Sequence, residues 1–221
     1  MTVFVTGATG YIGRPLVSTL IHRGHIVYAL TRPGSASRLP AGTVPVVGNA
    51  LDATTFQDAM PRGSTVVHLV GTPHPNPSKA AEFRRVDLGS IRATTAAAQH
   101  AGVTHLVYVS VAHPAPVMEA YIAARTEGES LVRATGIPAT IVRPWYVLGP
   151  GHYWPYLLIP VYWVLGALPS TREGARRLGL VKRSQMVAAL VTAVESPPER
   201  IRIVEVPEIA SAILQDRISV S

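Results

Sequence analysis

The chain has 221 residues, of which 48% are hydrophobic and only 15% are charged. This composition excludes a disordered chain, and the length suits one domain with a large core. Few charges remain to solvate the surface, so a partner, a membrane or a second copy could cover part of it. The net charge is +7, but the basic residues are spread out, without the aromatic-flanked patch of nucleic-acid binders. This charge suits acidic small molecules, and no nucleic-acid partner is expected.

Cysteine is absent from the chain. Disulfides, thiol nucleophiles and cysteine-ligated metal sites are thereby excluded. The eight histidines show no metal-ligand spacing, so no metal site is expected. The N-terminal residues lack the charged segment and long apolar stretch of a signal peptide, so a cytoplasmic location is expected.

Strand-like and helix-like segments alternate along the chain. Short β-branched runs predict strands, and apolar residues at helical spacing predict helices. In chain order the sequence predicts strand Thr2–Thr6, helix Tyr11–Arg23, strands Ile26–Leu30 and Val44–Val47, a short helix capped by Asp52, strand Thr65–Val70, helix Lys79–Ala101, strand Leu106–Ser110, helix Val117–Thr135, strand Thr140–Arg143, helix Ser184–Val194 and strand Arg202–Val206.

This alternation of elements predicts the fold class. Continuous apolar strands between helices are typical of a parallel sheet that is covered on both faces. The expected fold is therefore α/β, a doubly wound parallel Rossmann-type sheet. Residues 1–150 would form the dinucleotide-binding core, and residues 151–221 an aromatic-rich region that completes the same domain on the substrate side.

A glycine-rich turn follows the first predicted strand and opens the first helix. It reads G-x-x-G-x-x-G, with Gly7 for the tight turn, Gly10 for close approach to a pyrophosphate and Gly13 for helix packing. The helix N-terminus behind it favours anions. The pattern predicts dinucleotide binding, and the alternative is a bare structural turn. The residues expected at the cofactor are Gly7, Thr9, Gly10, Tyr11, Ile12 and Gly13.

The end of the second predicted strand bears on the choice of cofactor. A carboxylate there would bond both ribose hydroxyls of NAD, but no Asp or Glu occurs between Met1 and Leu51. Arg32 ends the strand and Arg38 follows, and an arginine can bind a 2′-phosphate through charge-assisted bonds. NADP(H) is therefore preferred over NAD(H). The alternative is that both arginines are solvated loop charges.

A second group of residues follows the later strands. Tyr121 and Arg125 are four residues apart, so they share a helix face, and Ser110 ends a strand at the carboxyl edge of the sheet. With the runs G-A-T-G-Y-I-G, L-V-Y-V-S and R-P-W-Y-V-L-G-P-G, the chain resembles the short-chain dehydrogenase/reductase superfamily. It is most similar to the atypical, NmrA-like, NAD(P)H-binding branch, which borders the extended epimerase/dehydratase branch.

The resemblance implies roles for these residues. Tyr121 would be the acid/base, Ser110 would orient the substrate oxygen, and Arg125 stands where the family has a lysine that holds the nicotinamide ribose. The arginine keeps the positive charge but changes the bond directions. The resemblance also implies cofactor contacts at Asn49, Ala50, Val70, Gly71, Thr72 and Pro144, and a substrate pocket beginning at Trp145, Tyr146 and His152.

Two functions follow from this reading. The first is an NADP(H)-binding, oxidoreductase-like protein that reduces or epimerises a small, largely apolar substrate. The second is a non-catalytic NADP(H) sensor or accessory subunit, which the departure at Arg125 favours.

An apolar segment, 154–168, carries no charge over fifteen residues and contains two prolines. It is too short and too rich in proline for a membrane-spanning helix. A lid over the substrate, a homodimer surface and an interfacial membrane contact through residues 153–183 remain open, beside simple core packing.

Overall fold

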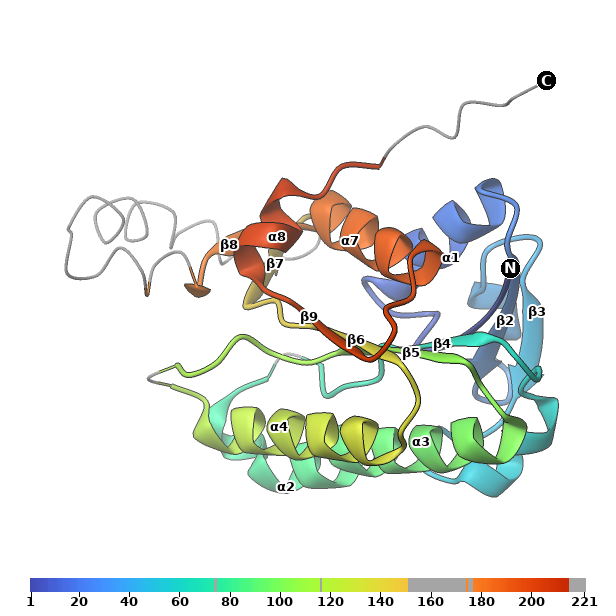
Figure 1. Cartoon of the computed structure of the whole chain (residues 1–221). Coiled ribbons are helices and arrows are strands. Elements are labelled where there is room, and N and C mark those ends of the chain that lie inside the picture. Colours follow the sequence, from blue (N-terminus) through green and yellow to red (C-terminus); the bar gives the residue numbers. More distant parts are fainter. Residues whose placement is uncertain (74, 116, 151–173, 175–176, 215–221) are drawn as a thin grey trace.

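The computed structural model describes residues 1–73, 75–115, 117–150, 174 and 177–214. Its centre is a sheet of seven parallel strands in the order β3-β2-β1-β4-β5-β6-β9 (Figure 1). The order reverses between β1 and β4, and such a switch point opens a crevice at the carboxyl ends of the strands. The strands are β1 (Thr2–Thr6), β2 (Ile26–Thr31), β3 (Val44–Val47), β4 (Thr65–His68), β5 (His105–Val109), β6 (Ala139–Val142) and β9 (Ile201–Val204).

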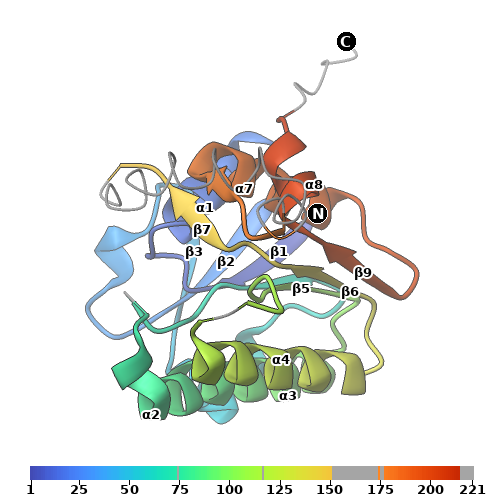
Figure 2. The ribbon, with the colours of Figure 1, turned by 90° about the vertical axis from the view of Figure 1, so that its left-hand side faces the viewer.

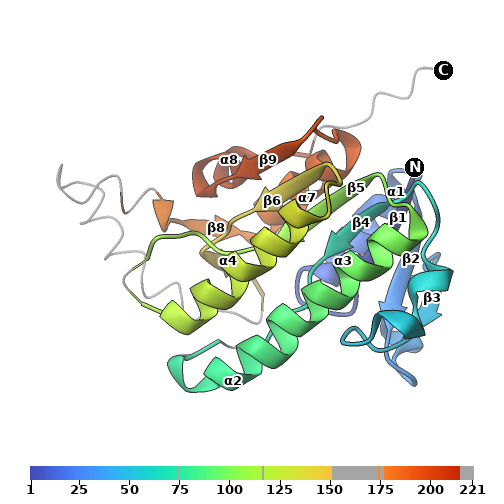
Figure 3. The same ribbon diagram turned by 60° about the horizontal axis from the view of Figure 1, so that its bottom comes forward.

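Helices cover both faces of the sheet. One layer holds α1 (Gly13–His22), α7 (Arg183–Glu195) and α8 (Val206–Ser211), and the other holds α2 (Ala80–Glu82), α3 (Gly89–Ala101) and α4 (Glu119–Ala134) (Figures 1 and 3). Successive strand residues enter opposite cores: Val3 and Val5 pack with the α1 and α7 layer, and Phe4 packs with the α3 layer. The predicted doubly wound α/β fold is confirmed.

Strand β3 forms one edge of the sheet and is poorly suited to pairing with a further strand. It is short, and it carries Pro45, which is paired in register with Ala29 of β2. Val44 and Val47 are exposed on this strand. Proline is found on edge strands because it has no N–H to donate to a ladder.

The structure departs from the predicted elements in two places. The predicted helix Lys79–Ala101 is divided, because a π-helical segment at Phe83–Leu88 separates α2 from α3. A single π-helical segment is a local change of hydrogen bonding within a longer helical stretch, and the apolar pattern of the sequence carries no separate signal for it. Two strands, β7 (Tyr146–Leu148) and β8 (Leu180–Lys182), form a small parallel sheet next to α7 (Figure 1; Figure 2 shows β7 beside α7). This sheet was not predicted, because three residues carry too little pattern.

Most other predicted boundaries lie within a few residues of those observed. Asp52 does cap a short helical turn, because its Oδ1 accepts a hydrogen bond of 3.1 Å from Thr54 N. No helix among the described residues is long and apolar enough to cross a membrane. The apolar segment 154–168 lies outside the described residues.

Two histidines lie inside the protein on neighbouring strands. His68 is 1% exposed at the end of β4, with its Nδ1 2.9 Å from Thr6 Oγ1 and 3.0 Å from Thr94 Oγ1. His105 begins β5, with its Nε2 3.1 Å from Thr140 Oγ1. Burial, assisted by Arg125, lowers the pKa of His68 to about 3, and burial, assisted by Arg202, lowers the pKa of His105 to about 4. Both rings are therefore neutral at physiological pH.

Stability should consequently fall in mild acid. The unfolded chain takes up these protons near pH 6.5, whereas the folded protein resists them down to about pH 4, so the free energy of unfolding decreases as pH falls through this window. Each group contributes up to about 1.4 kcal/mol per pH unit. Urea unfolding at pH 7, 6, 5 and 4 measures the slope. His105→Gln should reduce it, whereas His100→Gln, at an exposed position, should not; equal slopes in both variants would contradict this account.

Candidate functional site

The glycine turn between β1 and α1 is built as close packing requires. Gly7 has φ +75°, and a Cβ there would lie 2.9 Å from the carbonyl carbon of Leu69 in the β4 loop. A Cβ on Gly13 would lie 2.2 Å from Gly7 O. Side chains at these positions would push the turn away from both β4 and the start of α1. Gly10 N donates to Gly7 O at 3.0 Å and closes the turn.

The N-terminus of α1 is suited to an anion. Ile12 occupies the cap position and gives no side-chain hydrogen bond, and the first turn of the helix holds no acidic residue. The first amides of the helix and the positive end of its dipole therefore have no competing side chain. Thr9 and Tyr11 lie within this turn, so the residues present fit a dinucleotide pyrophosphate.

A basic corner follows β2. Arg32 and Arg38 are both exposed, and neither has an acidic partner among the residues the structure describes. The chain between them makes a tight turn, because Ser35 N donates to Arg32 O at 3.0 Å and Arg38 N to Ser35 O at 3.1 Å. The turn thus keeps the backbone of both arginines near the end of β2, where a 2′-phosphate would lie in a Rossmann site.

Asn49 follows β3 and holds a local turn. Its Oδ1 accepts from Leu51 N at 3.1 Å, and its own N–H donates to Thr55 Oγ1 at 2.9 Å. The expected contact of Asn49 and Ala50 with adenine therefore relies on the amide group of Asn49 and on backbone atoms.

Asp87 holds the loop after β4 through hydrogen bonds to Thr72. This aspartate lies in the π-helical segment and is 0% exposed. Its Oδ2 accepts hydrogen bonds from Thr72 N at 3.0 Å and from Thr72 Oγ1 at 2.6 Å. Asp87 thereby holds the stretch Val70, Gly71 and Thr72, which is expected to pass beneath the cofactor.

The other oxygen of Asp87 meets Arg125. Arg125 Nη2 lies 2.7 Å from Asp87 Oδ1, and Arg125 Nη1 donates to Val109 O at 2.8 Å. A Cβ on Gly71 would lie 2.1 Å from Arg125 Nη2, so the guanidinium fills the place of a side chain there. Burial opposes its charge, but Tyr121, Tyr108 and Asp87 hold the pKa of Arg125 above its usual value. Arg125 is thus a buried, fully charged link between α4, β5 and the β4 loop.

Tyr121 lies on that guanidinium. The Cζ of Arg125 is 5.3 Å from the centroid of the Tyr121 ring, and the Phe83 ring packs 5.0 Å away. No hydrogen bond to the Tyr121 hydroxyl occurs among the described residues. The structure therefore brings Tyr121 and Arg125 together, as their spacing predicts, but through the ring face and not through the hydroxyl.

Ser110 is engaged with a residue that the sequence analysis did not identify. Its Oγ donates to Glu129 Oε1 at 2.7 Å, and both residues are buried. Arg143 holds the same carboxylate, with Nε 2.8 Å from Oε1 and Nη2 on Oε2, while its Nη1 donates to Glu205 at 2.9 Å. Burial would raise the pKa of Glu129, but the hydrogen bonds from Arg143 and Ser110 hold it below its usual value.

The residues after β6 lie at the same edge of the sheet. Pro144 is buried, and its carbonyl accepts from Ala112 N at 2.9 Å. Trp145 packs against the α1 and α7 core, and its ring lies 5.4 Å from that of Tyr146. Burial raises the pKa of Tyr146. His152, the other residue expected at the substrate pocket, lies outside the described residues.

Asp87 and Glu129 were missed for different reasons. Glu129 had a signal, because Tyr121, Arg125 and Glu129 follow one another at intervals of four and share one helix face. Asp87 had little signal, because no other candidate residue shares its place in the predicted helix. Its partners, Thr72 and Arg125, come from the loop after β4 and from α4.

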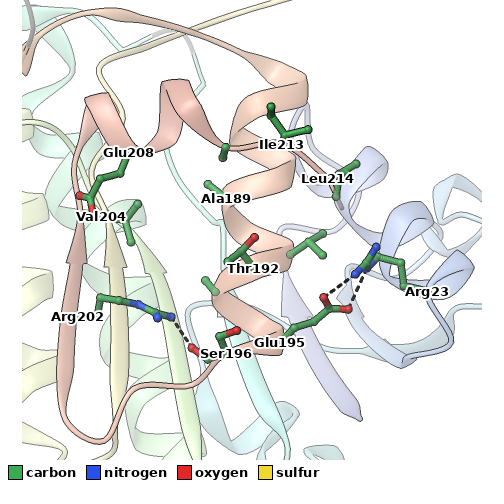
Figure 4. A pocket seen from close by; sticks show the side chains of 13 residues that line it. Arg23, Ala189, Thr192, Glu195, Ser196, Arg202, Val204, Glu208, Ile213 and Leu214 are labelled. Atoms are coloured by element: carbon green, nitrogen blue, oxygen red, sulfur yellow. Dashed lines mark hydrogen bonds and ion pairs between the residues drawn. The ribbon is translucent and has the colours of Figure 1, made fainter. Parts of the chain in front are cut away.

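A cavity of about 390 Å³ lies elsewhere, between α7, β9 and residues 212–214 (Figure 4). Its charged groups are used within the protein. Arg23 donates two hydrogen bonds to Glu195, at 2.9 and 2.7 Å, and Arg202 donates to Ser196 O. This cavity is separate from the glycine turn and from the edge that holds Tyr121.

Comparison with known proteins agrees with this geometry. A family model described as NAD(P)H-binding matches residues 7–150. A ceramide reductase of Caulobacter vibrioides is 33% identical over 151 residues, covering 67% of this chain and 47% of that protein. A 3-diazoavenalumate denitrifying reductase of a Streptomyces species is 32% identical over 223 residues, covering 89% and 73%. The chain spans about half the length of several curated relatives that it matches.

Solved structures share the fold. A short-chain dehydrogenase/reductase superfamily protein from Agrobacterium tumefaciens with bound NAD has a TM-score of 0.68 and 20% identity, over 93% of this chain and 77% of that one. The parallel sheet, its switch point and the glycine turn define a Rossmann dinucleotide-binding protein. More closely, the chain belongs to the family described as NAD(P)H-binding.

The contact between Gly71 and Arg125 can be tested directly. Gly71→Ala should displace the guanidinium from Asp87, lowering the free energy of unfolding by about 1–3 kcal/mol and weakening cofactor binding. Gly89→Ala is the matched control, because a Cβ there would make ordinary van der Waals contacts, with Leu51 Cδ2 at 3.6 Å and Arg84 O at 3.9 Å. In a helix this substitution should be neutral or slightly stabilising. Urea unfolding and calorimetric titration with NADPH measure both effects. Equal stability of the two variants would show that the guanidinium does not occupy this space.

Proposed function

We propose that the protein is an NADPH-dependent reductase of a small, largely apolar carbonyl compound, with Tyr121 as the proton donor. The observation that carries the proposal is the placement of Tyr121 on the buried charge of Arg125, at the edge of the sheet that also holds the β4 loop. Two relatives with more than 30% identity are named as reductases, which supports reduction over epimerisation.

Each group has a distinct part in this reaction. The glycine turn and the β4 loop would hold NAD(P)H, which would supply a hydride for the carbonyl carbon. Tyr121 gives its hydroxyl proton to the carbonyl oxygen, so that an alcohol results, and the charge of Arg125 stabilises the phenolate that is left. Asp87 keeps Arg125 and Thr72 in place while this charge forms. The apolar rings of Trp145 and Tyr146 would line the substrate side.

The preference for NADPH rests on the basic corner after β2. Arg32 and Arg38 lack acidic partners in the described part of the chain, and the first acidic residue of the sequence is Asp52. A 2′-phosphate would give both arginines a charged partner, whereas a 2′-hydroxyl would not.

We expect calorimetry to show tighter binding of NADPH than of NADH. Arg32→Ala should reduce the difference by roughly 1–3 kcal/mol, the scale of a hydrogen bond to a charged group. Arg92→Ala is the control, because Arg92 makes only an exposed ion pair with Glu127 and should leave the difference unchanged. Equal affinity of the unmodified protein for the two cofactors would refute the preference.

The role of Tyr121 predicts a specific loss. Tyr121→Phe keeps the ring on Arg125 and removes only the proton donor, so turnover should fall by about 10²- to 10⁴-fold while NADPH affinity changes little. Tyr28→Phe, which removes a hydroxyl from β2, should keep its activity. NADPH oxidation in a screen of carbonyl compounds measures turnover. Full activity of Tyr121→Phe would exclude the assigned role.

One observation favours a second function, a sensor that binds NADP(H) without turnover. Ser110, which would orient the substrate oxygen, donates its hydrogen to Glu129. If no carbonyl compound supports NADPH oxidation although NADPH binds, the sensor becomes the better account.

A further inference from the structure

Glu129 Oε1 is fully used as an acceptor. It receives hydrogen bonds from Ser110 Oγ at 2.7 Å and from Arg143 Nε at 2.8 Å. A carboxylate carries about two acceptor sites on each oxygen, so this oxygen has no free site. Because the Ser110 hydroxyl has one hydrogen, it cannot donate to Glu129 and to a substrate oxygen at the same time.

His113 faces the same oxygen without bonding to it. It follows β5 three residues after Ser110, and its Nε2 lies 3.6 Å from Glu129 Oε1. This nitrogen is buried and has no hydrogen-bond partner, and 3.6 Å is beyond hydrogen-bond range. The two atoms therefore lie close together in this structure but are not hydrogen-bonded to each other.

A proton on His113 changes which donors Oε1 can keep. The imidazolium Nε2–H is a charged donor, so its bond to the carboxylate adds an attraction between opposite charges that a hydroxyl donor does not supply. Of the two donors already present, Arg143 is anchored by further bonds to Glu129 Oε2 and to Glu205. Ser110 is held to Glu129 by a single bond from a donor that carries no charge, and its hydroxyl can rotate. Ser110 is therefore the donor that gives way.

We propose that His113 is a positioning residue for Ser110: when its ring is protonated it takes Glu129 Oε1, and the Ser110 hydroxyl is released toward the substrate oxygen. The part that concerns the substrate rests on the proposed reductase function. The same linkage explains how a serine that is fully engaged in the protein can still orient a substrate.

The surrounding charges set the conditions for this exchange. Glu129 and Glu205 are acidic, Arg143 lies between them, and Arg133 of α4 reaches to 3.9 Å from Glu129 Oε2 while remaining 42% exposed. These two acids and two bases balance, so the cluster is neutral before His113 gains a proton. The protonated His113 is stabilised mainly by its bond to Glu129 Oε1. Protonation of His113 therefore favours release of Ser110, and release of Ser110 equally favours protonation of His113.

The linkage can be measured without turnover. In Ser110→Ala the competing hydroxyl is gone, so His113 should protonate more readily, and its titration midpoint by NMR should rise by about 0.5 to 1 pH unit, the size of one hydrogen bond. His100, which pairs with Asp58 on the surface, is the internal reference and should titrate identically in both proteins. An unchanged His113 midpoint in a folded Ser110→Ala protein overturns the proposal.

A second measurement uses activity and does not need the Ser110 variant. In the unmodified protein, kcat/KM for carbonyl reduction should rise about 3- to 10-fold as pH falls through the His113 midpoint. His113→Gln should lose this dependence, whereas His100→Gln should keep it. A pH profile that is the same in His113→Gln as in the unmodified protein overturns the proposal. A complete lack of turnover would count against the reductase function, and the NMR titration would then decide the linkage alone.

Discussion

A carboxylate that no water reaches requires a cation, and at the carboxyl edge of this sheet that requirement fixes the geometry of the site. Asp87 is 0% exposed and Glu129 is 3% exposed. Their cations, Arg125 and Arg143, come from different elements, so each ion pair joins parts of the chain that are distant in sequence. Removing one member of such a pair would leave an uncompensated buried charge, which is strongly unfavourable. The loops around the glycine turn are thus held by charge pairing as well as by apolar packing.

This constraint also accounts for an arginine at position 125, where the resemblance described above implies a lysine. A lysine offers one compact ammonium group, whereas a guanidinium presents donors in a fixed plane. Arg125 uses that plane to reach Asp87 and Val109 O together, and its face also lies on the Tyr121 ring. The position of Arg125 therefore depends on its ion pair with Asp87 and on the absence of a side chain at Gly71, whose space the guanidinium fills. Arg125, Asp87 and Gly71 depend on one another. Replacing Arg125 alone by lysine would therefore leave Asp87 and Gly71 in an arrangement suited to the guanidinium.

The sequence predicts the architecture better than it predicts the chemistry of the site. Short β-branched apolar runs place β1 to β6, and apolar residues at helical spacing place α1 and α4, because burial acts on many residues at once. Tyr121 and Arg125 could be paired from spacing alone. The hydrogen bond from Ser110 to Glu129 could not, because it depends on how α4 docks against the end of β5. The division of the predicted helix at Phe83 likewise depends on local hydrogen bonding that leaves the apolar pattern unchanged.

Pro45 limits how copies of this protein can associate. Gly48 N donates inward to Thr31 O, and strand residues alternate in direction, so the backbone of Pro45 faces away from β2. An added strand would meet a ring there in place of an amide, which disfavours extension of the sheet across two molecules at β3. The ring thereby also makes the edge with the exposed Val44 and Val47 a poorer template for aggregation. Association through the helices, the loops or the opposite edge at β9 would not meet this obstacle.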